Sequence, residues 1–517
     1  MQQHAIVIGA GFGGIAAALR LRHRGYRVTL IEQLDQLGGR ATVTKRNGFT
    51  WDMGPTVITA KFLFDELFEL FGKKREDYVK FVDLYPWYRV QFADGSFFDY
   101  GGTIEQTLEQ IRKFSPEDCD GYLKFLEHSK RIFEVGFVEL GDKPFDTLGS
   151  MLRCAPQMIK LGAWRTVWGL AKKYIRNDKL RRVFSFQPLL VGGNPFNTTS
   201  IYSLIHYLER EWGVQYAMGG TGALVNALGK LMEQEGIEVV LNQKVEQLGI
   251  GVLSQCLIPP DPKRLPLRAE LARAATRIVG VRLQSGHVIV LAPGAGDIVV
   301  CNADAPFVHQ HLLKNHSVSQ RRLDKLKYSM GLFVLHFGTS KQYLDVKHHT
   351  ILLGEKYQQL LHEMFDLKML EMSDFSVYLH RPTATDPSMA PPGHDCWYVL
   401  CPVTNLQANI DWKTMGPKYR DLIVAYLERV ALPKLSEHIV EEFFVTPEHF
   451  RDKLSTLHGT GFSIQPTFGQ SAYFRFQNKS EDIANLYFVG AGTHPGAGIP
   501  GVLCSAKVLE RVLPKNL

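Results

Sequence analysis

HAIVIGAGFGGIAAALRLRHRGYRVTLI, residues 4–31, is the stretch that decides the fold. The apolar run at 4–8 is rich in β-branched residues and ends at a glycine, which predicts a strand buried on both faces of a parallel sheet. A helical pattern runs from Ile15 to about Arg24, and residues 26–31 predict a second strand. This order of strand, glycine loop, helix and strand is typical of a dinucleotide-binding unit in an α/β fold.

Three glycines and one carboxylate give this unit its expected chemistry. Gly9, Gly11 and Gly14 are spaced as GxGxxG. The first permits a tight turn, the second lets the backbone approach a pyrophosphate, and the third allows a helix to pack closely on a strand. Glu32 ends the second strand, where its carboxylate can accept hydrogen bonds from both ribose hydroxyls of an adenosine.

The segments after Glu32 favour FAD over NAD. Leu37-Gly38-Gly39-Arg40 brings backbone close to a ligand, and Arg40 offers fixed guanidinium donors to a phosphate. The alternative for Arg40 is a surface salt bridge. Further along, the turn Gly54-Pro55-Thr56 is placed to approach the isoalloxazine end of a flavin.

A second glycine-rich segment lies near the other end of the chain. Residues 485–502, NLYFVGAGTHPGAGIPGV, predict a buried strand, a loop and the start of a helix. Such a loop presents backbone N–H groups to a ligand. We expect the flavin's pyrimidine ring and ribityl chain to contact Gly490, Gly492, Thr493, His494, Gly498, Ile499, Pro500, Gly501 and Val502. Two such segments around one cofactor imply a discontinuous cofactor domain.

A third piece fits the same domain. The glycines of residues 219–222 precede a helical stretch, and residues 237–241 predict a strand that leads to Val245. In dinucleotide-type flavin folds, the residue after such a strand often passes under the adenine. Val245 is therefore our candidate for that contact, and an ordinary core valine is the alternative.

Composition excludes several classes of protein. The composition, 45% hydrophobic and 21% charged residues, predicts a folded protein. The length of 517 residues predicts two or three subdomains. Its seven scattered cysteines show no metal-ligand spacing, so we expect a reducing, cytoplasmic-side environment and no metal site. The charge of +7 is spread along the chain, which favours an anionic membrane surface over nucleic acid. The sequence contains no uninterrupted apolar run of the length that a membrane-spanning helix needs, so we expect no such helix.

The chain resembles the bacterial phytoene desaturases, a carotenoid desaturase family among the flavin amine oxidase-like folds. The resemblance covers nearly the whole chain, and the blocks that carry it are VIGAGFGGIAAALRL (7–21), LGGRA (37–41), DMGPTVIT (52–59), FSFQPLLVGGNPF (184–196), SIYSLIHYLEREWGV (200–214), GGTGAL (219–224) and NLYFVGAGTHPGAGIPGV (485–502). It implies FAD, a carotenoid precursor and repeated removal of hydrogen.

Fold class and domains follow from the motifs and the resemblance together. We predict an α/β fold in which a discontinuous Rossmann-like FAD-binding domain holds an inserted mixed-sheet substrate domain and a helical subdomain. The expected boundaries are 1–75, 216–305 and 470–517 for the FAD-binding domain, 76–100 and 306–469 for the substrate domain, and 101–215 for the helical, membrane-associating subdomain.

Two departures from the family pattern stand out. Residues 249–277 look like an insertion where the family has a short turn. Ser150 stands where the relatives carry an acidic residue, which weakens any carboxylate base at that position. Arg153 is our candidate catalytic residue, because a fixed positive charge would stabilise the reduced flavin; lining the entrance or facing a membrane surface are the alternatives.

A membrane-facing helix is expected between Leu161 and Ile175. Apolar residues recur there at three- and four-residue steps, at Leu161, Trp164, Trp168, Ala171 and Ile175, and lysines and arginines flank them. This pattern is typical of an interfacial helix and equally of a core-facing amphipathic one. A water-insoluble substrate must be collected from lipid, which favours a peripheral location on the cytoplasmic side of the cell membrane.

The expected function is FAD-dependent desaturation of 15-cis-phytoene towards lycopene. A side chain cannot accept hydride, so the flavin must, and a weak base or water suffices for the proton. Oxygen or a membrane quinone would reoxidise the flavin. The alternatives are a C30 diapophytoene desaturase, a later 3,4-desaturase, an amine oxidase, and a non-catalytic isoprenoid carrier on the same fold.

Overall fold

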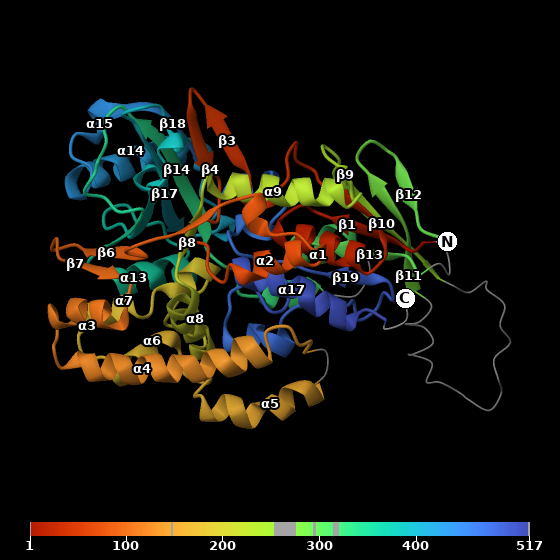
Figure 1. Cartoon of the computed structure of the whole chain (residues 1–517), viewed down its shortest axis with the longest axis horizontal. Helices are drawn as coiled ribbons and strands as arrows, with labels where there is room; N and C mark the ends of the chain where they lie inside the picture. The colour runs from red at the N-terminus through yellow and green to blue at the C-terminus, as the bar shows by residue number, and fades with distance from the viewer. Residues whose placement is uncertain (1, 146–147, 253–275, 293–295, 314–319, 515–517) are drawn as a thin grey trace.

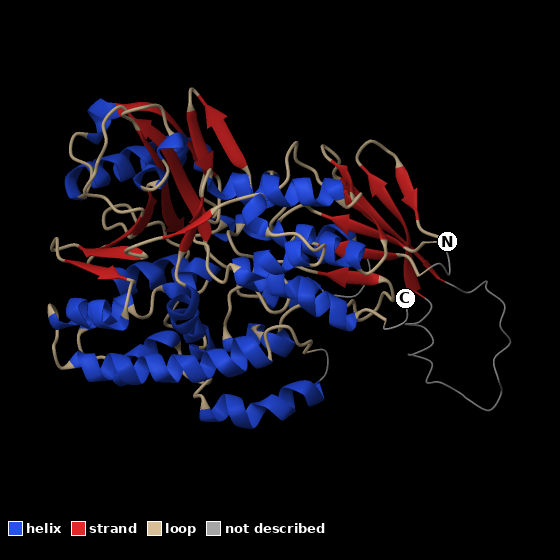
Figure 2. Cartoon of the chain, in the orientation of Figure 1, coloured by secondary structure: helices blue, strands red, loops and turns tan. Residues whose placement is uncertain are grey.

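The computed structural model describes residues 2–145, 148–252, 276–292, 296–313 and 320–514. Figures 1 and 2 show a parallel sheet with helices packed on it, a second large sheet next to it, and a layer of helices along one side of the molecule. These are the three parts that the sequence predicts.

The parallel sheet has five strands in the order β19-β13-β1-β2-β9. Their bounds are β1 His4–Ile8, β2 Arg27–Ile31, β9 Glu238–Val240, β13 Ile298–Cys301 and β19 Leu486–Phe488. Helices α1 (Phe12–His23), α9 (Gly220–Gln234) and α17 (Ile499–Val512) share one apolar core with it. Strands from both ends and the middle of the chain thus build one sheet, which confirms the prediction of a discontinuous cofactor domain.

The second sheet has seven strands in the order β18-β14-β17-β16-β15-β6-β7. Their bounds are β6 Tyr88–Phe92, β7 Phe97–Tyr100, β14 Gly331–Thr339, β15 His349–Leu353, β16 Val377–His380, β17 Asp395–Val403 and β18 Ile439–Val445. β15 pairs with β6 in parallel and the other pairs are antiparallel, so the predicted mixed sheet is confirmed.

The two faces of this sheet belong to different cores because side chains alternate along a strand. In β14, Phe333 and Leu335 pack with α14 (Trp412–Val430), whereas Leu332 and Val334 face the helical layer. The helical layer therefore covers one face of the second sheet.

The helical layer lies below the second sheet in the view of Figure 1. It comprises α3 Ile104–Arg112, α4 Asp118–Phe133, α5 Leu148–Lys160, α6 Val167–Tyr174, α7 Asp178–Val183 and α8 Leu204–Trp212. A capping box fixes the start of α3, where Thr103 accepts from the Gln106 backbone and Gln106 accepts in return. α5 is the outermost helix (Figure 1). None of the helices in the described part of the chain is long and apolar enough to cross a bilayer.

The remaining elements lie outside the two sheets and the helical layer. They are β3 Val43–Arg46, β4 Phe49–Asp52, β5 Phe81–Asp83, β8 Gln215–Ala217, β10 Val245–Val252, β11 Thr276–Leu283, β12 Val288–Val290, α2 Phe62–Glu69, α11 Ala305–Phe307, α12 Gln320–Lys325, α13 Tyr357–His362, α15 Leu435–His438 and α16 Pro447–Asp452. Val252 and Thr276 are partners in an antiparallel pair, and most of the predicted insertion, residues 253–275, lies outside the described residues. The domain boundaries themselves stay a prediction.

Candidate functional site

One cavity of about 670 Å³ joins the two sheets. At one end its wall is the backbone of the glycine-rich segments after β1 and β19. At the other end the wall is aliphatic and aromatic, and includes Phe186, Leu332, Leu361, Leu400 and Phe450. A polar ligand at the first end and a long apolar ligand at the second would therefore share one space.

Four loops meet at one edge of the five-stranded sheet because β1, β2, β13 and β19 run parallel. Gly9 follows β1, Glu32 follows β2, Asn302 follows β13, and Gly490 lies two residues beyond β19. In open α/β sheets the carboxyl edge is where ligands bind. The structure thus brings the two predicted glycine segments together.

Asn302 holds these loops to each other, and sequence reasoning missed it. Its Nδ2 donates to the Gly9 carbonyl at 3.3 Å. A Cβ at Gly13 or at Gly490 would lie only 2.6 Å from its Oδ1. Because both glycine loops close on one amide, a side chain at either position would push them apart.

The GxGxxG glycines have the physical roles expected of them. Gly9 has a φ of +93°, which disfavours any residue with a Cβ. A Cβ at Gly14 would lie 2.0 Å from the Gly9 carbonyl oxygen, so only glycine lets α1 pack this close to β1. Gly39, with a φ of +58°, would place a Cβ 3.2 Å from the Gly11 Cα.

The Glu32 carboxylate is buried and fixed in orientation. One oxygen accepts from the Ala10 N–H at 2.6 Å and the other from the Leu34 N–H at 2.9 Å. Burial raises the pKa of Glu32, and the backbone hydrogen bonds oppose that shift. The Gln243 N–H donates to the Glu32 backbone oxygen, which brings the segment leading to Val245 to this place. Val245 packs in the core with Ile8, so its contact with an adenine stays a prediction.

Arg40 lines the cavity and carries donors without partners. Its Nε and Nη2 are buried and make no hydrogen bond to the described residues. Burial lowers the pKa of Arg40 and Asp304 opposes this shift, so the side chain remains a cation. A Cβ at Gly54 would lie 2.0 Å from the Arg40 carbonyl oxygen, which explains why a glycine passes there. An unpaired guanidinium in a glycine-lined cavity is suited to a phosphate group.

A buried arginine shapes the carboxyl-terminal loop. Arg475 is 1% exposed and donates to the carbonyls of Ala491 at 2.6 Å and Thr493 at 3.1 Å. Because these carbonyls point to Arg475, the opposite side of the loop faces the cavity together with the first turn of α17. His494 lies there with its Nε2 3.1 Å from the Lys143 carbonyl, and burial lowers the pKa of His494 to about 4.

The predicted cofactor residues divide into two groups. Those that line the cavity are Gly11, Arg40, Gly54, Pro55, Thr56, Gly490, His494, Gly498, Ile499, Pro500, Gly501 and Val502. Those outside its lining are Gly9, Gly14, Glu32, Gly39, Val245, Gly492 and Thr493. The orphaned Arg40 donors and the crowded glycines show that the residues present fit a dinucleotide flavin.

Two predictions about the helical layer do not agree with the structure: the catalytic role of Arg153 and the lipid-facing stripe of residues 161–175. Arg153 is exposed on α5, outside the cavity lining, with its Nε 3.4 Å from the Gly149 carbonyl, which favours the surface alternative over a catalytic one. The side chain of Ser150 lies outside the described residues. Leu161, Ala171 and Ile175 are buried, which contradicts a lipid-facing role for these three and favours the core-facing alternative, whereas Trp164 is 66% exposed. Other helices already cover this apolar side.

Glu209 is a second residue that sequence reasoning missed. It lies on α8, lines the cavity and is 0% exposed to solvent. In the sequence it stands in the charged run Glu209-Arg210-Glu211, which is typical of a solvated surface. The one signal for Glu209 is its place on α8, because the apolar residues Ile205 and Leu208 of the same helix also line the cavity.

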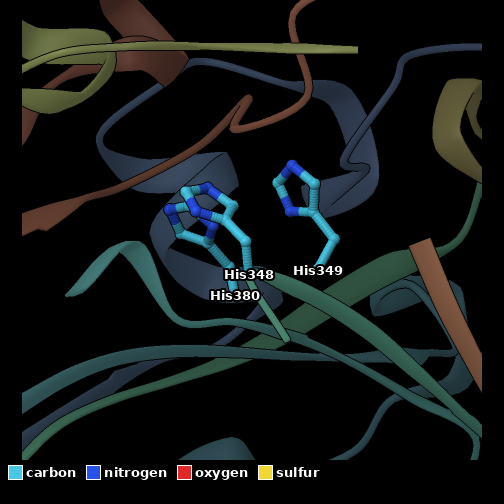
Figure 3. Close-up of side chains that lie close together, drawn as sticks. All are labelled: His348, His349 and His380. Carbon is cyan, nitrogen blue, oxygen red and sulfur yellow. The ribbon is translucent and has the colours of Figure 1, made fainter. Parts of the chain in front are cut away.

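Three buried histidines form the one candidate metal cluster found among the described residues. His349 and His380 are cross-strand partners of β15 and β16, and His348 precedes β15. One ring nitrogen from each lies within 4.8 Å of the others, and Figure 3 shows the three rings gathered on one side of the strands. Burial keeps their pKa values below the usual range, and Arg381 adds to this effect at His348.

The chemistry of this histidine cluster favours a structural role. The charges of Arg381 and Asp386 act on the pKa of His348 in opposite directions, so the cluster has no strong net charge beside it. The His349 Nδ1 instead lies 2.7 Å from the Tyr378 hydroxyl, and Tyr378 lies 2.6 Å from the Thr56 hydroxyl at the cavity wall. The cluster thus ties the cofactor segment to the second sheet.

Comparison with known proteins agrees with this geometry. The family of flavin-containing amine oxidoreductases matches residues 12–507. A lycopene-forming phytoene desaturase of Pseudescherichia vulneris is 44% identical over 99% of both chains. A 4,4'-diapophytoene desaturase of a Methylomonas species is 32% identical over 99% of this chain and 96% of its own. The solved structure of cyclohexylamine oxidase from Brevibacterium oxydans has a TM-score of 0.58 at 14% identity, over 99% of both chains.

Proposed function

The chain belongs to the flavin-containing amine oxidoreductase family, in the branch of the phytoene desaturases, and from this premise we propose that it is an FAD-dependent phytoene desaturase. It introduces several double bonds into 15-cis-phytoene and forms lycopene. The observation that carries the proposal is the single cavity whose wall changes from glycine backbone and Arg40 to aliphatic side chains. That wall suits a phosphate-bearing cofactor and a hydrocarbon in one space.

FAD, when bound, supplies the acceptor for the hydride that each desaturation removes. Arg40 and the glycine loop at the start of α1 would hold its phosphates, and Glu32 its adenosine ribose. The Pro55–Thr56 turn and the loop around Gly490 would position the reacting ring. The apolar wall holds the polyene in line and keeps water away from the reacting carbons.

The substrate alternatives differ in support. The lycopene-forming relative is 44% identical and the C30 relative 32%, which favours a C40 substrate over a C30 one. A non-catalytic isoprenoid carrier would not need the orphaned donors of Arg40, so that alternative is disfavoured.

We also propose a peripheral attachment to the cytoplasmic side of the cell membrane, through α5 and the residues that follow it. Leu152, Ile159 and Trp164 are 62%, 68% and 66% exposed, and Ile159 and Trp164 also line the cavity. Basic side chains at Arg153 and Lys160 stand between them. An apolar rim with cations around a cavity mouth is suited to drawing a hydrocarbon directly from lipid.

Vesicle binding tests this attachment. Ile159→Ser with Trp164→Ser should reduce co-sedimentation with anionic vesicles severalfold, because about 0.8 kcal/mol is lost for each buried CH₂ group. Val290→Ser is the matched control, since Val290 is 74% exposed on β12, away from the rim. Equal binding of both variants would contradict the attachment.

The proposed electron acceptor is oxygen or a membrane quinone. Anaerobic turnover with and without added quinone separates the two. Rapid turnover without oxygen once quinone is added identifies the quinone, and turnover that requires oxygen identifies oxygen.

The function itself is tested by expression in cells that accumulate phytoene, followed by pigment chromatography. The expected result is lycopene, together with a yellow purified protein that carries FAD. Arg40→Ala should abolish both the lycopene in the cells and the yellow colour of the purified protein. Phytoene left unchanged by a protein that holds FAD would contradict the substrate assignment.

A further inference from the structure

Glu209 is the only carboxylate among the described residues that line the cavity. Its side chain is closed off from bulk water, with a relative exposure of 0%. Its Oε1 accepts a hydrogen bond from the Tyr88 hydroxyl at 2.8 Å, whereas its Oε2 is buried and makes no hydrogen bond within the described part of the chain. One oxygen is thus anchored, and the other is available to a group in the cavity.

Tyr88, the partner of Glu209, begins a series of side-chain contacts that leads to Thr56. Tyr88 lies next to His349, with ring centroids 5.9 Å apart, and His349 bonds to Tyr378. Tyr378 in turn contacts Thr56, which belongs to the segment expected at the isoalloxazine. A short chain of contacts therefore connects Glu209 to the cofactor segment.

Burial raises the pKa of Glu209 to about 7, and the bond from Tyr88, the contact with Gln187 and the charge of Arg210 oppose the shift. Tyr100 also faces this carboxyl, and burial keeps it protonated with a pKa well above 10. His206, packed against Tyr100, stays neutral because burial lowers its pKa to about 3. Glu209 is therefore the group here that changes its charge near neutral pH.

Resting on the proposed function, we propose that Glu209 is the catalytic base that takes the proton in each desaturation. Hydride leaves one carbon of a CH₂–CH₂ unit for FAD, and the C–H bond of the adjacent carbon breaks. Its electron pair becomes the new π bond, and the proton goes to Oε2 of Glu209. The carboxyl group returns that proton to solvent before the next double bond forms.

Other groups at the cavity are less suited to this role. His494 lies in the carboxyl-terminal glycine loop and its pKa of about 4 makes it a weaker base than Glu209. Tyr378 and Tyr398 have a pKa raised above the usual 10 by burial and carry no free negative charge at neutral pH. A base with a pKa near the working pH suits repeated uptake and release of protons.

The decisive variant is Glu209→Gln, which keeps the size of the side chain and can still accept from Tyr88. We expect the rate of double-bond formation at pH 8 to fall by about 10²–10⁴-fold. FAD content and melting temperature should stay as in the unchanged protein. Glu211→Gln is the matched control, because Glu211 lies two residues away on α8 and is exposed.

The pH profile gives a second readout. With Glu209 as base, the rate should rise with pH through about 7, and Glu209→Gln should lose this limb. Tyr88→Phe should move the limb to higher pH, because it removes a hydrogen bond that stabilises the carboxylate.

Infrared difference spectroscopy reads the same group without turnover. A protonated-carboxyl band that disappears as pH rises through about 7 should be present in the unchanged protein and in Glu211→Gln, and absent in Glu209→Gln. Full activity of Glu209→Gln with an unchanged pH limb would overturn the proposal. Failure of the unchanged protein to convert phytoene would instead overturn the proposed function, and the base with it.

Discussion

Replacing Arg40 by methionine should separate cofactor binding from folding. The substitution keeps an unbranched side chain but removes the Nε and Nη2 donors, which are buried and have no partner among the residues that the structure describes. Each charge-assisted hydrogen bond to a phosphate contributes about 1.5–3 kcal/mol, so two such bonds contribute about 3–6 kcal/mol. The Kd for FAD should therefore rise roughly 100- to 10,000-fold, since about 1.4 kcal/mol corresponds to a factor of ten.

The apoprotein should respond in the opposite direction. Arg40→Met removes a buried, unpaired cation, so the free energy of unfolding without FAD should stay constant or rise. Arg20→Met is the matched control, because Arg20 is also an arginine with little exposure but bonds to Glu66 at 3.0 Å and Glu510 at 2.8 Å. It should cost about 1–3 kcal/mol of stability, because both carboxylates keep some solvent, and leave FAD affinity unchanged.

Two measurements are enough for this comparison: flavin titration by fluorescence quenching, and urea unfolding of the FAD-free proteins. If Arg40→Met binds FAD within threefold of the unchanged protein, the phosphate role is refuted. If it lowers the stability of the apoprotein as Arg20→Met does, Arg40 is a structural residue.

Three further predictions follow from single positions. Burial raises the pKa of Asp52 from 3.8 to about 6, so stability should fall as pH rises from about 4 to about 6, and Asp52→Asn should remove up to about 3 kcal/mol of that fall in urea titrations at each pH. Gly14→Ala should lower the melting temperature and the FAD content together, because its Cβ would lie 2.0 Å from the Gly9 oxygen; Gly469→Ala, with open space around it, should change neither. Metal analysis of the purified protein should find less than stoichiometric zinc, copper or iron, and a full equivalent lost in His349→Gln would contradict the structural role of the histidine cluster.

The cofactor half of the fold was predictable because its signals are local. Gly9 and Gly14 stand at positions where a side chain would not fit, and the need for glycine at such positions can be inferred from the sequence alone. The carboxyl-terminal loop at Gly490 gave the same kind of signal. Their meeting at one sheet edge followed from the direction of parallel strands.

The substrate half was less predictable because its signals depend on tertiary packing. The stripe from Leu161 to Ile175 has the period of a helix with one apolar side, but periodicity does not tell whether lipid or protein covers that side. Glu209 reads as a surface charge in the sequence, and only the packing of α8 against β6 buries it beside the cavity. Arg475 and Asn302 act through the loops that they connect, so no local pattern marks them.

The order of strands in the five-stranded sheet bears on how the protein matures. β1 lies between β13 and β2, and the edge strand β19 comes from residues 486–488, some 480 positions later. At least 488 residues must therefore be synthesised before β19 can complete this sheet, and contacts this distant in sequence form slowly. We therefore expect tight flavin binding to follow the pairing of β19 with β13, which brings the second glycine loop to the carboxyl edge of the sheet.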